Sequence, residues 1–174
     1  MALKPNEINQ LNVVSFQTNF TRIPNIDFFC QSVNIPSIAL GLYLQGTTFM
    51  DQPIEGDKLT LEQLNISFYV NEDLSNYLEI YNWMIALGFP DNYNQFTLSD
   101  RLTDSGDTST QFRSDMNVIL NTNKSNPNFN VTFKDAFPVS LGAINLEVTS
   151  TSLEPIAVEA SFAYSGSFSI EKIK

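Results

Sequence analysis

The sequence has no histidine among its 174 residues. Histidine is the commonest general base near neutral pH and the commonest metal ligand, so neither a Ser-His-Asp nor a Cys-His site can be built. There is also no G-x-S-x-G segment, no G-x-x-x-x-G-K-[ST] phosphate loop and no G-x-G-x-x-G segment. We therefore expect no catalytic residue, no cofactor and no bound metal, and we do not expect an enzyme.

Two segments match a chemical motif only in part. Ser169 and Lys172 have the S-x-x-K spacing, but they lie in an alternating stretch, where residues three apart face opposite sides of a strand. Asp100, Asp104 and Asp107 lack the alternate spacing of a hand-type calcium loop and its bidentate glutamate. We interpret the first segment as part of a strand and the second as a solvated acidic loop.

Cysteine and basic residues are scarce. The single cysteine, Cys30, excludes an internal disulfide, and its apolar neighbours predict that it acts as a small buried hydrophobic residue. Nine basic residues stand against 19 acidic ones, which gives a net charge of −10. Because affinity for nucleic acid comes largely from neutralised phosphates, this charge argues against DNA binding. It is compatible with DNA passing close by without specific binding.

Long hydrophobic runs are missing as well. Asn, Asp or Pro interrupts each apolar stretch before it reaches the roughly 20 residues of a membrane span. The N-terminal stretch also has no apolar segment of signal-peptide length. We therefore expect no membrane insertion, and we expect a protein that is made and kept in the cytoplasm.

Apolar residues, which make up 43% of the chain and include 14 phenylalanines, suffice for the core of one domain over residues 1–174. Alternation of apolar and polar residues predicts seven or eight strands, with a bulge near 62–63 and a bend at Gly166. The expected fold is mostly β, a β-sandwich or barrel with one packed α-helix and long loops. The predicted strands cover residues 12–20, 26–33, 64–70, 116–120, 129–133, 144–148 and 156–171.

The one convincing helix covers residues 72–87, with Asn71 as N-cap and Gly88 just after its end. It carries two apolar stripes on nearly opposite sides. One contains Leu74, Tyr77, Leu78, Tyr81, Met84 and Ile85, and the other contains Ile80, Trp83 and Leu87. A helix on a sheet needs only one such stripe. Either a loop of the same chain or a neighbouring subunit covers the second, so Ile80, Trp83 and Leu87 are candidate inter-subunit contacts.

Three segments show no regular pattern. Residues 1–11 form a polar N-terminal arm, and residues 91–115 form a long polar loop. Residues 34–57 form a long loop or an extended flap that is too apolar to be fully solvated. Either a second subunit or the domain itself must cover its apolar side chains, which makes them the other candidate inter-subunit contacts: Leu40, Leu42, Tyr43, Leu44, Phe49 and Met50.

The order of these features resembles the tail tube proteins of contractile-tailed, T4-like bacteriophages. The resemblance is collinear over most of residues 12–171, and the order of the motifs carries it. The matching segments are FFCQSVNIPSIALG (28–41), PIEGDKLTLEQLNISFYVNED (53–73), NYLEIYNWMIALGFP (76–90), FKDAFPVSLGAINLEV (133–148) and ASFAYSGSFSI (160–170).

The resemblance implies a virion subunit that forms hexameric rings, which stack into a hollow conduit for genome delivery. It also implies three protein partners, namely the tail sheath, the baseplate and the tape-measure protein. A main tube subunit and a baseplate tube-initiator or tail-end ring protein share this fold, so both remain open. The alternative of another class is a monomeric binding module, with Tyr43, Trp83 and Tyr93 as an aromatic platform.

Overall fold

The computed structural model describes residues 11, 15–88, 91, 95, 112–147 and 154–173. The predicted N-terminal arm, except Leu11, and most of the predicted 91–115 loop lie outside these residues, as do Tyr93 and the aspartates at 100, 104 and 107. The elements in chain order are β1 (Phe16–Phe20), α1 (Pro24–Phe29), β2 (Cys30–Asn34), β3 (Ile38–Gly46), β4 (Asp51–Leu61), β5 (Leu64–Tyr69), α2 (Ser75–Gly88), β6 (Ser114–Asn121), β7 (Pro127–Leu141), β8 (Ala157–Ala163) and β9 (Ser169–Lys172).

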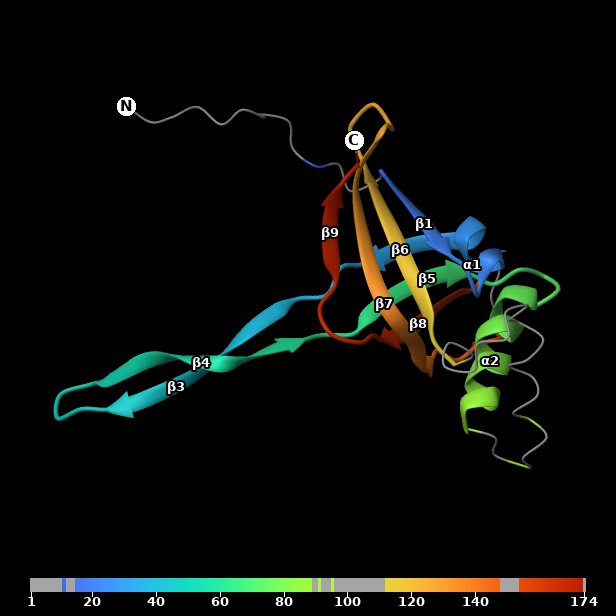
Figure 1. Cartoon of the computed structure of the whole chain (residues 1–174). Helices are drawn as coiled ribbons and strands as arrows, with labels where there is room; N and C mark the ends of the chain where they lie inside the picture. The colour runs from blue at the N-terminus through green and yellow to red at the C-terminus, as the bar shows by residue number, and fades with distance from the viewer. Residues whose placement is uncertain are drawn as a thin grey trace.

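The body is one seven-stranded antiparallel sheet folded into two layers. Its strand order is β1-β6-β7-β8-β5-β2, and β9 pairs with β7. The long strand β7 belongs to both layers, because its first part pairs with β6 and β9 and its last part pairs with β8. Asp135, at a φ of 52°, marks the change between the two parts. Figure 1 shows the strands of the two layers crossing, with α1 and α2 on the side of the body away from the β3–β4 hairpin.

The core fills the space between the layers. Inward positions alternate with outward ones along β5 and β8, as period-2 patterning predicts. The largest buried side chains come from both layers and both helices: Phe20, Ile23, Ile26, Leu64, Ile66, Phe68, Ile80, Trp83, Met116, Val118, Phe133 and Phe162. The mostly β fold with a packed helix is thus confirmed, and the sheet does not close into a barrel.

Of the two alternatives for the second apolar stripe of α2, the structure favours cover by the same chain and contradicts its use as a contact with another subunit. Ile80 and Trp83 lie in the core, at 0% and 1% exposure, and Leu87 packs against it. The residues that point outward are Leu74, Leu78 and Tyr81. The buried face starts at Asn76, whose amide donates to the Tyr69 carbonyl (2.7 Å) and so anchors the helix to the end of β5. The stripes of α2 were identified from apolar side chains alone, so the polar Asn76 could not be recognised as part of the buried face.

Other predicted boundaries also differ. Residues 26–29, the first half of the strand predicted at 26–33, belong to α1, whereas 30–33 lie in β2. Pro24 occupies the first turn of α1, and the Asp27 carboxylate accepts a hydrogen bond from the Phe20 amide (3.0 Å). Residues 142–147 are not a strand. The long C-terminal strand is divided into β8 and β9 by a turn at Gly166, which has a φ of 69°. Residues 62–63 connect two strands and do not form a bulge within one.

Candidate assembly surfaces

The segment predicted as a long loop at 34–57 is mostly a β-hairpin. Strands β3 and β4 pair antiparallel with each other and, among the described residues, with no strand of the body. Figure 1 shows this ribbon projecting far from the body. The prediction of a loop is wrong, because the prolines and glycines of this segment hide the alternation of its strands. The alternative prediction, an extended flap, describes the hairpin.

The hairpin continues the β2–β5 pair beyond Pro36. Strand β3 follows β2 in the chain, and β4 leads into β5. The antiparallel pair of β2 and β5 in the body is therefore followed by the antiparallel pair of β3 and β4 in the hairpin. Proline cannot donate to a ladder and is found at strand edges and breaks, which explains the interruption. The hairpin therefore leaves the body at its β2 edge.

Nearly all side chains of the hairpin are exposed. Alternation places Ile38 and Leu40 on one face of the inner half of β3, and Leu42 and Leu44 share one face of its outer half. Their neighbours across the ladder include Leu61 and Leu59, which pair with Ile38 and Leu40. The residues predicted here as inter-subunit contacts, namely Leu40, Leu42, Tyr43, Leu44, Phe49 and Met50, are all exposed in the single subunit. That they contact another subunit stays a prediction.

Two glycines allow the strands of the hairpin to approach at a register shift between Leu40 and Leu42. A Cβ atom added to Gly56 would lie 2.7 Å from the carbonyl oxygen of Gly41 and 2.8 Å from its carbonyl carbon. No backbone tolerates contacts this short, so the two chains would have to separate. The direction of the outer half of the hairpin depends on this crossing.

Gly56→Ala is expected to reduce self-assembly at least tenfold, because the displaced backbone redirects the outer half of the hairpin. The free energy of unfolding should change by no more than about 0.5–1 kcal/mol, since among the described residues the hairpin pairs with no strand of the body. Sedimentation velocity measures the assembled fraction and urea denaturation measures stability. Gly46→Ala, where the added Cβ would sit 3.6 Å from the nearest atom, is the control and should assemble normally. Equal assembly of the two variants would contradict this role for Gly56.

Strands β2, β5, β8 and residues 137–141 of β7 form one layer of the body, which we call the inner layer, and in the described part of the chain its two outermost strands each have an open edge. Within the described residues, β2 pairs only with β5, and residues 137–141 of β7 pair only with β8. An open edge offers a row of backbone donors and acceptors to another strand. The two edges lie at opposite ends of one layer, so they can join copies head to tail.

The outward face of this layer is polar and nearly uncharged. Across β5 and β8, Asn65 pairs with Ser161 and Ser67 pairs with Glu159. In β2, β5, β8 and residues 137–141, Glu159 carries the one carboxylate and there is no lysine or arginine. The layer is therefore a largely polar surface with a single carboxylate, and it also carries Tyr69 and the exposed Val139.

Sites for chemistry are not evident in the part of the chain that the structure describes. It contains no group of three or more His, Cys, Asp or Glu residues that could hold a metal ion. Burial, reinforced by nearby Asp27, raises the pKa of the half-buried Cys30 thiol to about 11, which keeps it protonated and unreactive at neutral pH. None of the described helices is long and apolar enough to cross a membrane.

The aromatic platform of the alternative binding module does not form. Trp83 is buried against Phe162, with ring centroids 6.0 Å apart, and its indole N–H donates to the Phe112 carbonyl (2.9 Å). Tyr43 lies in the exposed hairpin, and Tyr93 is outside the described residues. No surface therefore presents Tyr43 and Trp83 together.

Solved structures with a similar fold come from contractile injection systems. A chain of the anti-feeding prophage baseplate is 15% identical, with a TM-score of 0.57, and 90% of each chain is covered. The cap that terminates the anti-feeding prophage tube is 12% identical, with a TM-score of 0.59, over 99% of this chain and 95% of that one. A chain of the PVC sheath–tube complex is 13% identical, with a TM-score of 0.51, over 95% and 94%. Identities this low show the shared fold.

The sequence itself matches a family. The model of the phage tail tube protein family covers residues 2–169. A search of curated protein sequences finds no match, so the assignment rests on the family model and is consistent with the fold. The family model, which covers nearly the whole sequence, therefore identifies the chain as a member of the phage tail tube protein family, a structural component of the phage tail.

Proposed function

We propose that six copies of this subunit join edge to edge into a ring and that the rings stack into a hollow tube for genome delivery. The single observation that carries the proposal is the exposed apolar hairpin, which continues the open β2 edge of the body. An isolated two-stranded ribbon is marginal in water, and an apolar surface of this extent is typical of an interface. A neighbouring copy would cover it.

The two open edges support closure of the ring. If the β2 edge of one subunit pairs with residues 137–141 of β7 in the next, the backbone groups of both edges gain partners. Pro138 lacks an N–H and can occupy such an edge. A head-to-tail interface repeats around an axis and closes when its rotation divides a full turn, which here is six-fold. The inner layers would then form one continuous barrel around the lumen.

In this arrangement the outward face of the inner layer lines the lumen. Its polar side chains and the carboxylate of Glu159 would leave DNA without a cationic partner. Like charges repel within the screening length of about 8–10 Å, so the genome would pass without adhering. This role needs transient passage of DNA and no specific binding.

The proposed partners beyond the ring are the tail sheath, the baseplate and the tape-measure protein, with assembly in the host cytoplasm. The similar structures support the first two, because they include a baseplate chain and a chain of a sheath–tube complex. A similar fold also occurs in a tube-terminating cap. The second candidate is therefore a baseplate tube-initiator or tail-end ring protein. It differs from the main tube subunit only in its position along the tail.

Electron microscopy and mass measurement of the purified protein test the proposal. We expect extended hollow filaments with six-fold symmetry, and in their reconstructed map Glu159 should face the lumen. Single rings that do not elongate would favour the initiator or terminal ring. A protein that stays monomeric at high concentration, alone and with isolated baseplates, would contradict both assignments.

A further inference from the structure

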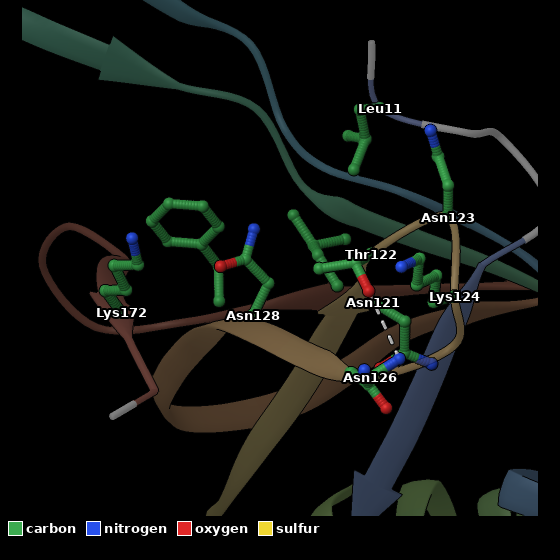
Figure 2. Close-up of a pocket in the computed structure, with 10 residues that line it drawn as sticks. Leu11, Asn121, Thr122, Asn123, Lys124, Asn126, Asn128 and Lys172 are labelled. Carbon is green, nitrogen blue, oxygen red and sulfur yellow. Dashed lines mark hydrogen bonds between the residues drawn. The ribbon is translucent and has the colours of Figure 1, made fainter. Parts of the chain in front are cut away.

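A cavity of about 830 Å³ lies at the end of the body where the β6–β7 turn meets β9. Half-buried Leu120 and Phe129, together with Leu11, provide its apolar surface. Figure 2 shows Lys124 and Lys172 at opposite ends of the row of lining side chains. A volume of this size matches sites that accept several side chains or a small ligand.

The charge of this cavity is opposite to that of the protein. It is lined by two of the nine basic residues of the chain and by no acidic residue, in a protein with a net charge of −10. Besides the two lysines and the apolar residues, the lining consists of Thr122 and four asparagines. The cavity therefore favours an occupant that is apolar at its centre and negatively charged beside it.

The tip of the β3–β4 hairpin has that chemistry. Phe49 is 97% exposed, and Met50 beside it is exposed as well. A hydrogen bond from the Thr47 amide to the Met50 carbonyl (3.2 Å) closes the turn, and the Thr47 hydroxyl bonds the same carbonyl, so the turn is ordered. The acids Asp51 and Glu55 follow on β4, and no basic residue lies between 42 and 55.

We propose that the hairpin tip of one subunit inserts Phe49 into the Lys124–Lys172 cavity of a second copy, with Asp51 facing the lysines. Figure 1 shows the tip projecting away from the body, whereas the cavity lies at the end of β6, β7 and β9. One subunit therefore cannot fill its own cavity with its own tip. The contact joins two different surfaces, so it propagates from copy to copy instead of ending at a dimer.

This inference rests on the proposed function and specifies which surfaces meet between copies. It combines burial of an aromatic side chain, which dominates interface energetics, with charge complementarity, which sets register and orientation. The other occupant that the sequence offers is the chain's own N-terminal segment, since Leu11 already borders the cavity. The experiment below separates the two.

Disulfide trapping in a Cys30→Ser background tests the contact. Thr48→Cys places a thiol beside Phe49, and Asn123→Cys places one at the rim of the cavity. After assembly of a mixture of the two variants and oxidation, we expect a covalent dimer on a non-reducing gel, because a disulfide forms only between closely placed Cα atoms. Neither variant alone should form the dimer. Asp73→Cys, an exposed position before α2, is the control partner and should give none.

Two further variants test whether burial of Phe49 and charge pairing of Asp51 hold the contact together. Phe49→Ser in the Thr48→Cys protein should lower the yield of covalent dimer at least tenfold. Asp51→Lys in the Thr48→Cys protein should also lower the yield of covalent dimer. Mixing this protein with an Asn123→Cys protein that also carries Lys124→Glu and Lys172→Glu should restore the yield. Restoration by reversed charges would not be expected if the variants only unfolded the hairpin. Failure of the reversal would remove the lysines from the proposal.

The outcomes separate this contact from the proposed function. If the wild type forms tubes or rings but the mixed Thr48→Cys and Asn123→Cys variants give no covalent dimer, the contact is overturned and the proposed function stands. Absence of any assembly in the wild type would overturn both. An intramolecular disulfide between Asn9→Cys and Asn123→Cys would show that the N-terminal segment fills the cavity, which would also overturn the proposal.

Discussion

Deletion of residues 41–56 is expected to leave a folded monomer that no longer forms rings or tubes. The outer hairpin pairs with no strand of the body among the described residues, so its removal costs the core nothing. Leu40 pairs with Leu59, so the deletion leaves Asp57 and Lys58 as a two-residue connection between paired positions. Two-residue loops are the commonest hairpin connections, and the shortened hairpin should therefore fold.

The size of the effect follows from the exposed apolar side chains that the deletion removes. Each fully buried side chain of this kind contributes about 1.5–3 kcal/mol, and the deleted segment carries six: Leu42, Tyr43, Leu44, Phe49, Met50 and Ile54. Loss of even half of that burial would lower the association constant of each contact between subunits by several powers of ten. Sedimentation velocity and electron microscopy measure the outcome, and circular dichroism checks the fold.

A matched variant distinguishes the side chains from the backbone of the hairpin. Leu42→Ser, Leu44→Ser and Phe49→Ser together keep the length of the ribbon and its ladder, and they remove only apolar surface. We expect this triple variant to stay monomeric as well. Tubes of normal length from the deletion variant would show that assembly does not use the hairpin.

Trp83→Ala is expected to destabilise the subunit by about 3–5 kcal/mol, which is a large share of the roughly 5–15 kcal/mol that holds a domain folded. The indole is 1% exposed, contacts Phe162 and donates to the Phe112 carbonyl. The guanidinium of Arg22 lies over the ring, 4.8 Å from its centroid. Burial lowers the pKa of Arg22, so the ring faces a cation that has already lost much of its hydration.

Tyr81→Ala is the control on the opposite side of the same helix. Its side chain is 46% exposed, and the substitution should cost about 0.5 kcal/mol or less. Urea denaturation followed by circular dichroism measures both variants, because Trp83 is the only tryptophan and its fluorescence is lost with it. A larger loss for Tyr81 than for Trp83 would contradict the assignment of the buried face.

The strands of the body were largely predictable. Leu64, Ile66 and Phe68 alternate with polar residues because one face of β5 meets the core, and the same pattern marks β6 and β8. Alternation is a local property, so it survives in a single sequence. The absence of histidine is a matter of composition, so it excludes most catalytic chemistry whatever the fold.

The hairpin shows where local patterns fail. Gly41, Gly46, Gly56 and Pro53 are signals for turns, and they led to the prediction of a loop at 34–57. In the structure Pro53 lies on an edge of a ribbon, and Gly41 and Gly56 allow its strands to cross closely. Which residue pairs with which depends on positions up to 23 residues apart, as between Ile38 and Leu61.

Composition and alternation are enough to predict an acidic, histidine-free, mostly β subunit, and the order of its motifs indicates the tail tube family. The burial of one face of α2 could not be read from the sequence, since both stripes are apolar and the buried face also contains the polar Asn76, which donates to the Tyr69 carbonyl. The sequence also did not show that the apolar β3–β4 hairpin pairs with no strand of the body among the described residues. The physical reason is the same in both cases: periodicity shows that a face is apolar, but only its partners in space determine whether that face is core or surface.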